Sequence, residues 1–247
     1  MFIEHIRIDR GREHPDGWPF TLAAVEHLAA RGLAFRRPIT FLVGENGSGK
    51  STLIEAIADA VKINAEGGKA GTRYASTGPK TPLGDAITAD LTSAGLRLVG
   101  GPRRARNGFF LRAETLFNLA RNVSGLYGFW DEDLETQSHG EGFFTVFGAM
   151  LKPPGLFLLD EPEAALSFSS CLRLVAILHE LAEAGSQIIC ATHSPVLAAT
   201  PGAEIIEVGA HGLRRTSWEE LELVDHWRRY LSNPHAYLRH LIQSEGR

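Results

Sequence analysis

Residues 41–57 read FLVGENGSGKSTLIEAI, an apolar strand pattern followed by a glycine-bearing loop and then by a helical pattern. Within this stretch, Gly44–Ser51 matches G-x-x-x-x-G-K-[ST], the phosphate-binding loop, in the strand–loop–helix context that the motif requires. The glycines let successive backbone N–H groups curl around an oxyanion, and the N-terminus of the next helix adds partial positive charge. A glycine loop that only turns a strand into a helix is the alternative, but such a match rarely arises by chance.

The loop predicts specific contacts with a bound nucleotide. Lys50 is expected to meet the β- and γ-phosphates, and the hydroxyl of Ser51 is expected to ligate Mg²⁺. The apolar positions of residues 53–61 predict a mostly buried helix whose first turn carries both side chains. The residues expected to bind the nucleotide from the loop and this first turn are Asn46, Gly47, Ser48, Gly49, Lys50, Ser51 and Thr52.

Composition limits what the rest of the chain can be. With 247 residues and a hydrophobic fraction of 44%, we expect a single domain over residues 1–247 with one large core. A formal net charge of −4 argues against a protein that simply coats nucleic acid or an acidic membrane. Cys171 and Cys190 lie in apolar runs and predict buried, reduced thiols. Because the sequence has no membrane-length apolar stretch and no apolar signal core at its start, we expect a cytoplasmic protein.

A second apolar strand ends in acidic residues. Residues 155–163 read GLFLLDEPE, and a continuous apolar run is typical of a central parallel strand. Open α/β sheets bind ligands at the carboxyl ends of such strands. Asp160 is therefore expected to hold the Mg²⁺ water shell beside Ser51, and Glu161 to orient the attacking water or accept its proton. Any buried strand can end in Asp-Glu before a turn, but the upstream phosphate loop favours this Walker B interpretation.

The strand that follows ends in a histidine. Residues 187–195 read QIICATHSP, so His193 comes at the C-terminal end of the next β-α unit after Asp160 and Glu161. A histidine there can be a satisfied core residue. Its place at the same edge of the sheet favours a sensor of the γ-phosphate.

Residues 137–141 read QSHGE and precede apolar positions at helical spacing. The pattern S-x-x-E in front of such a helix is a capping box, with Ser138 as the N-cap and Glu141 reaching back. Its position between the phosphate loop and the Asp160 strand favours a second role, in which Ser138 and Gly140 form a phosphate-binding helix start. The two interpretations are compatible, since a capped helix N-terminus still has N–H groups free for an anion.

The flanking sequence predicts further elements. Three arginines, Arg103, Arg104 and Arg106, form a basic loop that either contacts phosphates of a nucleotide or nucleic acid or is solvated charge, which is the commoner case. The expected strands cover residues 2–8, 35–43, 96–99 and 108–111, and the expected helices cover 22–29 and 162–185. A surface excursion is expected over 64–84, a hairpin over 203–215, and an amphipathic helical segment over 218–240.

The ordered set GENGSGKS, QSHGE, LFLLDEPEAALS and ATHSP resembles the ABC-type ATPase family, and in particular its small soluble members often called AAA family or predicted ATPases. The resemblance covers nearly the whole chain. It implies an α/β fold of the P-loop NTPase type, with a mainly parallel central sheet flanked by helices and an N-terminal antiparallel β portion. It also implies a signature-bearing helical part at about residues 100–150.

The resemblance further implies a mechanism. ATP and Mg²⁺ are the expected cofactors, and two copies are expected to close head to tail as a homodimer. Ser138 and Gly140 of one subunit would then meet the γ-phosphate held by Lys50 of the other. Within the family's motifs, Glu161 matches the catalytic glutamate and His193 matches the switch histidine.

The chain departs from the family pattern in three places. QSHGE replaces the transporter signature LSGGQ, with His139 where glycine is usual. No clear Q-loop glutamine is present, although Glu114 falls in that region, and no aromatic residue is an obvious platform for adenine. The chain also lacks the long coiled coil that SMC-type ATPases insert between the phosphate loop and the signature.

Two hypotheses from different classes follow. The first is an enzyme, a homodimer that hydrolyses ATP with Mg²⁺ and couples turnover to a conformational change. The second is a nucleotide-gated interaction module with weak hydrolysis, which binds nucleic acid or a protein partner in DNA maintenance or phage defence. A transporter ATP-binding subunit is less favoured, because LSGGQ and a recognisable Q-loop are missing.

Overall fold

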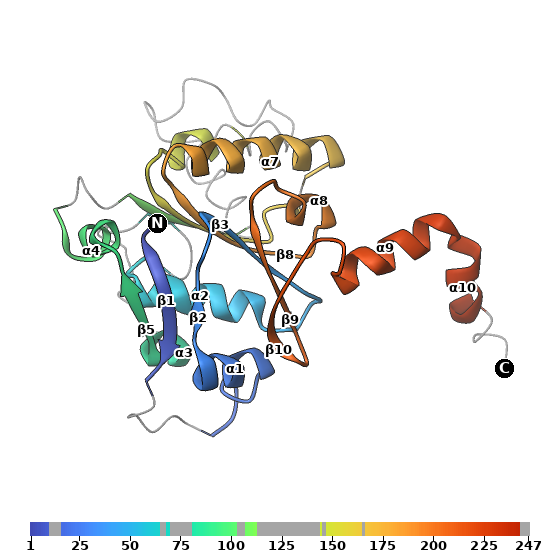
Figure 1. Cartoon of the computed structure of the whole chain (residues 1–247), viewed down its shortest axis with the longest axis horizontal. Helices are drawn as coiled ribbons and strands as arrows, with labels where there is room; N and C mark the ends of the chain where they lie inside the picture. The colour runs from blue at the N-terminus through green and yellow to red at the C-terminus, as the bar shows by residue number, and fades with distance from the viewer. Residues whose placement is uncertain are drawn as a thin grey trace, which may run out of the picture.

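The computed structural model describes residues 1–9, 16–64, 68–69, 81–102, 107–112, 144, 147–164 and 166–242. Within these ranges the chain forms two sheets surrounded by helices (Figure 1). The strands are β1 (Ile3–Ile8), β2 (Leu33–Ala34), β3 (Ile39–Val43), β4 (Gly68–Lys69), β5 (Ile87–Leu91), β6 (Gly108–Arg112), β7 (Leu156–Asp160), β8 (Gln187–Thr192), β9 (Glu204–Gly209) and β10 (Gly212–Thr216). The helices are α1 (Ala23–Arg31), α2 (Lys50–Ala60), α3 (Pro82–Ala86), α4 (Ser93–Gly100), α7 (Phe168–Glu183), α8 (Pro195–Ala198), α9 (Glu222–Ser232) and α10 (Pro234–Ile242).

The larger sheet places the phosphate loop. Its strand order is β10-β9-β3-β8-β7-β6-β4, in which the neighbours from β9 to β6 run parallel and the edge strands β10 and β4 run antiparallel. β3, β7 and β8 are buried along their whole length, as expected for the apolar runs of central parallel strands. Because these strands are parallel, their C-terminal ends lie at one edge of the sheet.

The smaller sheet is antiparallel and has the order β2-β1-β5. A buried glutamine joins it to the larger sheet. The Gln187 side chain accepts hydrogen bonds from the N–H groups of Phe2 (2.6 Å) and Ile3 (2.8 Å), and it donates to the Ile3 carbonyl (2.9 Å). The predicted fold class, a mainly parallel sheet flanked by helices with an N-terminal antiparallel portion, is thereby confirmed.

Helices cover both faces of the larger sheet, with α2 on one face and α7 on the other (Figure 1). The side chains of β3 alternate between the two cores, since Leu42 packs with α1 and α2 whereas Phe41 and Val43 pack with α7 and α8. Cys171 and Cys190 are free and buried, as predicted. None of the helices within the described ranges combines the length and the apolarity that a membrane span needs.

Several element predictions differ from the structure. The strand predicted over residues 96–99 is wrong, because residues 93–100 form α4. Its N-cap is Thr92, whose hydroxyl accepts the N–H of Gly95 at 3.1 Å. β3 is shorter than the strand predicted over residues 35–43, and α7 begins only at Phe168, after a turn. The C-terminal segment is two helices, because Pro234 supplies no N–H and begins a new helix.

Candidate active site

The phosphate loop holds a buried cation. Between β3 and α2, Gly47 and Gly49 have φ of +81° and +97°, in the left-handed region that favours glycine. The Lys50 side chain bends back so that its ammonium donates to the carbonyl groups of Gly44 and Glu45, both at 2.8 Å. Burial lowers the pKa of Lys50 below its usual value, and nearby carboxylates oppose this shift. A cation at the N-terminus of α2 makes this loop attractive to an anion.

Ser51 and Asp160 bring two oxygen ligands together. The Ser51 hydroxyl, in the first turn of α2, donates to Oδ1 of Asp160 at the end of β7, with a distance of 2.9 Å. Burial raises the pKa of Asp160 from 3.8 to about 6, opposed by the Ser51 hydrogen bond and the charge of Arg112. Mg²⁺ usually binds one or two such protein oxygens together with phosphate and water. The pair therefore fits a Mg²⁺ ion that shares its coordination with a nucleotide.

Arg112 is a site residue that the sequence did not reveal. It ends β6 and pairs in parallel register with Asp160 on β7. Its Nη2 atom lies 2.9 Å from Oε1 of Glu55 on α2, and its Nε atom lies 3.9 Å from Oδ2 of Asp160. The guanidinium thus brings a positive charge close to both carboxylates. Neither contact can be read from the local sequence, because both depend on the strand register.

Glu161 and His193 meet at the ends of β7 and β8. Glu161 has φ of +49°, which is uncommon for a residue with a side chain, and its N–H donates to the Ala191 carbonyl at 2.9 Å. Its Oε1 atom lies 3.4 Å from Nδ1 of His193. Such backbone outliers cluster at functional sites, where surrounding contacts hold them in place. The strained conformation of Glu161 therefore supports a functional role for its carboxylate.

Glu163 binds the backbone of His193 and the side chain of Thr192. It is buried, and its Oε1 atom accepts the His193 N–H at 2.9 Å and the hydroxyl of Thr192. The same oxygen lies 3.7 Å from Nδ1 of His193. Glu163 thus fixes the end of β8 that carries the histidine. It stands two residues after Glu161 in the acidic motif, so the sequence carried a signal for it.

Lys50, Ser51, Asp160 and Glu161 line a cavity of about 450 Å³. One of its lining residues is aromatic, namely Trp18, which is 70% exposed. The sequence alone had indicated no aromatic platform for adenine. The residues that line the cavity are Trp18, Leu22, Asn46, Gly47, Gly49, Lys50, Ser51, Thr52, Arg112, Asp160, Glu161 and Ala164. Anion-binding, metal-ligating and acidic groups thus face one space large enough for part of a small ligand.

The predicted site residues fall into three groups. Most of the phosphate-loop residues line the cavity with Asp160 and Glu161, and His193 contacts Glu161. Ser48 lines a neighbouring cavity instead. The residues of the predicted signature and of the basic loop, Ser138, Gly140, Arg103, Arg104 and Arg106, lie outside the described residues, as does Glu114.

Comparisons with known proteins identify related domains and chains. The family model described as "AAA domain" matches residues 28–79, and the one described as "AAA domain, putative AbiEii toxin, Type IV TA system" matches residues 142–199. A "Putative ABC transporter ATP-binding protein" of Staphylococcus aureus (strain COL) is 27% identical over 174 residues, which cover 64% of this chain and 29% of that protein. The hemin import ATP-binding protein of Rhodopseudomonas palustris (strain BisB5) is 31% identical over 176 residues, which cover 64% of this chain and 66% of that protein.

A solved structure shares the fold over nearly all of the chain. cbiO1 from Clostridium perfringens, part of an ABC transporter complex, superposes with a TM-score of 0.51 at 14% identity, covering 98% of this chain and 99% of that one. The fold, the two motif-bearing family matches and the relatives agree, and the chain belongs to the ABC-type P-loop ATPases. Membership of this family agrees with the predicted ATP-binding site, and the chain spans about 29% of the length of the first of these relatives.

Proposed function

We propose that the chain binds Mg²⁺ and ATP and hydrolyses the nucleotide by in-line attack of water on the γ-phosphate, in a site that a second copy completes. One observation carries this proposal. The Lys50 ammonium, the Ser51–Asp160 pair and the Glu161 carboxylate line a single cavity. Phosphoryl transfer needs little covalent chemistry from a protein, and it depends on placing such charges around the phosphates and the water.

The phosphate chain would lie along the loop. Residues 46–52 supply backbone N–H groups at the start of α2, and Lys50 exchanges its two carbonyl partners for phosphate oxygens. Ser51 and Asp160 would hold Mg²⁺, which when bound neutralises charge on the β- and γ-phosphate oxygens. Arg112 keeps a positive charge beside Asp160 and Glu55.

Glu161 would act on the water. Its carboxylate orients the attacking water and accepts its proton, while His193, 3.4 Å away, contacts the γ-phosphate and holds Glu161 in place. The hydrogen bond from the His193 N–H to Glu163 keeps the histidine backbone at the end of β8. Glu163 is therefore a positioning residue in this proposal.

Trp18 would stack on the base. It is exposed, and it is an aromatic residue that lines the same cavity as Lys50 and Thr52. Every nucleobase offers a π face, so a ring in this position binds the base without reading its edge. Sequence inspection misses Trp18 because it lies 32 residues before Lys50, in a loop without a motif.

Ser138 and Gly140 would come from the second copy. A site shared between two chains predicts that the ATPase rate per subunit rises with protein concentration until the homodimer is saturated. The test is to measure steady-state turnover over a wide range of concentrations, with light scattering in parallel, for the unmodified chain and for Ser138→Ala. A constant rate per subunit from a chain that remains monomeric with ATP would contradict the shared site.

A transporter subunit is the second candidate, since two relatives are named as ABC transporter and hemin import ATP-binding proteins. Such a subunit acts only with a membrane partner. Affinity purification from membranes, with and without ATP, tests this role. Recovery of a membrane protein that depends on the intact chain would favour transport, and ATPase activity that needs no partner would favour the homodimer.

A further inference from the structure

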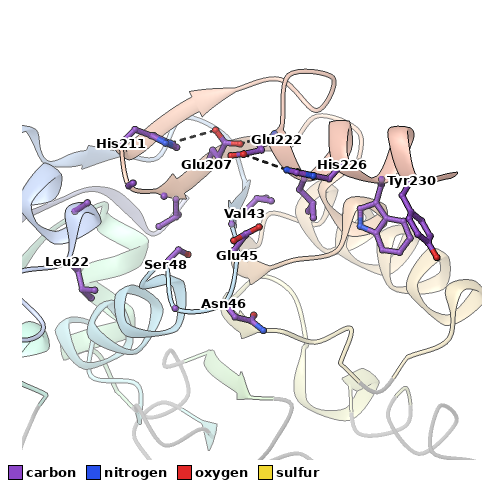
Figure 2. A pocket seen from close by; sticks show the side chains of 18 of the residues that line it. Leu22, Val43, Glu45, Asn46, Ser48, Glu207, His211, Glu222, His226 and Tyr230 are labelled. Atoms are coloured by element: carbon purple, nitrogen blue, oxygen red, sulfur yellow. Dashed lines mark hydrogen bonds and ion pairs between the residues drawn. The ribbon is translucent and has the colours of Figure 1, made fainter. Parts of the chain in front are cut away.

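A second cavity borders the phosphate loop on the side of β9 and the C-terminal helices. Its volume is about 730 Å³, within the range of ligand sites. Figure 2 shows its walls, which are the outer side of the loop with Glu45 and Ser48, the β9–β10 hairpin with Glu207 and His211, and α9. Tyr237 adds a wall from α10, and Thr21–Ala23 close the side toward α1.

Four rings from α9 and α10 form what we call the aromatic cage: His226, Trp227, Tyr230 and Tyr237. Neighbouring rings stand nearly perpendicular to each other, with angles of 89° for Trp227–Tyr230, 87° for Tyr230–Tyr237 and 83° for His226–Tyr237. The centroid distances are 6.5, 5.9 and 6.2 Å in the same order. His226 and Tyr237 are also joined by a hydrogen bond between Nδ1 and the hydroxyl. Each perpendicular pair packs the edge of one ring against the face of the other, and the remaining surfaces of the four rings border the cavity.

The walls of this cavity are acidic. Glu45, Glu207 and Glu222 line it, and among the residues that the structure describes there, none is lysine or arginine. Glu207 is already paired with Arg214, and its other oxygen accepts the N–H of Glu222 at 3.0 Å. The Glu222 carboxylate is exposed and lies 3.6 Å from Nε2 of His226. Together with Glu45 it gives the cavity a negative field beside the cage, and this field favours a cation and disfavours a phosphate.

A cation–π pair already exists near the cage. The Arg228 guanidinium, on α9, lies 5.3 Å from the centre of the Trp218 ring. The other cation–ring pair between described residues joins Arg173 to Phe144, so neither pair uses a ring of the cage. Trp227 and Tyr230 are 46% and 36% exposed. These two rings therefore keep part of their surface accessible to a cation from another molecule.

We propose that this cavity binds a basic peptide segment of a partner protein, with an arginine side chain inserted into the aromatic cage and paired with Glu222. Arginine fits better than lysine, because its planar guanidinium stacks on rings and forms two parallel hydrogen bonds with a carboxylate. Nucleic acid fits poorly, because its phosphates would face Glu45 and Glu222. A peptide held here lies against the phosphate loop, since Leu22, Asn46 and Gly47 line both cavities.

The test is calorimetric titration of the whole chain, without nucleotide, with a capped tri-arginine peptide and with its citrulline counterpart. Citrulline keeps the planar shape and removes the charge. We expect saturable binding of the arginine peptide, weakened about tenfold by Tyr230→Ala and by Glu222→Gln. Tyr230→Phe keeps the ring and is expected to retain binding. Leu231→Ala, an exposed position next to the cage that does not line the cavity, is the matched control.

Three results would overturn the proposal. The first is equal binding of the citrulline peptide, and the second is an equal loss in Leu231→Ala. The third is binding of a single-stranded oligonucleotide that depends on Tyr230 while the arginine peptide does not bind, because the cage would then stack bases. Circular dichroism of each variant separates loss of binding from loss of folding. Since no nucleotide is present, this outcome is independent of whether the chain hydrolyses ATP.

Discussion

The two cavities on either side of the phosphate loop share Leu22, Asn46 and Gly47, yet their chemistry differs. The nucleotide cavity combines Lys50 and Arg112 with two carboxylates, and its polar groups come from the ends of neighbouring strands and from the first turn of α2. The second cavity has carboxylates and aromatic rings without a described lysine or arginine. One loop therefore separates a site suited to an anion and its metal from a site suited to a cation.

The difference also shows how each cavity is built. Rigid central strands position the nucleotide cavity, whereas the C-terminal helices, which extend from the body in Figure 1, supply one wall of the second. Substitutions in one cavity should therefore leave ligand binding in the other unchanged, apart from effects carried through the shared loop.

The largest effect is expected for Lys50→Ala. The substitution removes the buried ammonium that would bind the β- and γ-phosphates, so ATP affinity should fall at least about a hundredfold. Binding of the arginine peptide should be unchanged. Titration with both ligands measures this, and an equal loss of both would mean that the substitution collapses the loop rather than removing one contact.

His193→Ala is expected to reduce turnover by about a hundredfold while ATP affinity changes little. The reason is that His193 holds Glu161, which acts on the water, whereas the phosphate loop and Lys50 carry most of the ATP binding. Steady-state kinetics separate kcat from KM. A rise in KM with constant kcat would assign His193 to binding instead.

One aromatic residue in each cavity can be substituted to compare the two sites. Trp18→Ala should weaken ATP binding about tenfold and leave peptide binding unchanged, whereas Tyr230→Ala should do the reverse. Trp18→Phe, which keeps a ring, is the control. Fluorescent-nucleotide titration and peptide calorimetry on the same preparations provide the readout. If Trp18→Ala leaves ATP affinity intact, another residue carries the base.

The smallest effect concerns stability. The folded pKa of Asp160, about 6, lies above its ordinary value of 3.8, so the folded chain holds an extra proton between these pH values. The cost of its buried charge is absent below about pH 4 and complete above about pH 6. Asp160→Asn should therefore raise Tm by about 5 °C at about pH 8, and by about half of that at about pH 5. Thermal unfolding without ligands tests this, and a lower Tm at every pH would contradict it.

How far the sequence predicts the molecule depends on the range of the interactions. Lys50, Ser51 and Asp160 sit in motifs whose local pattern determines their backbone, and the structure places them together. The residues of α4 fit a strand or a helix equally well in so short a segment, and the Thr92 cap was the overlooked signal. Arg112 and the aromatic cage could not be predicted, because strand register and the packing of distant segments create their contacts.

Some expectations remain predictions. These are the single domain over residues 1–247, the cytoplasmic location, the homodimer with Ser138 and Gly140 at its seam, and the nucleic-acid contact of the basic loop. The last two depend on a second molecule and on residues outside the described ranges. The concentration dependence of turnover and the salt dependence of any DNA-stimulated ATPase activity test the last two.

Single-turnover hydrolysis by Glu161→Gln tests the central claim most directly. Glutamine keeps the shape of the side chain and removes the base, so the variant should bind ATP with unchanged affinity and cleave it at least about a hundredfold more slowly. ATP should then stay bound, and the homodimer should persist in light scattering. Undiminished cleavage by a correctly folded Glu161→Gln would contradict the account, because the base would have to be another group.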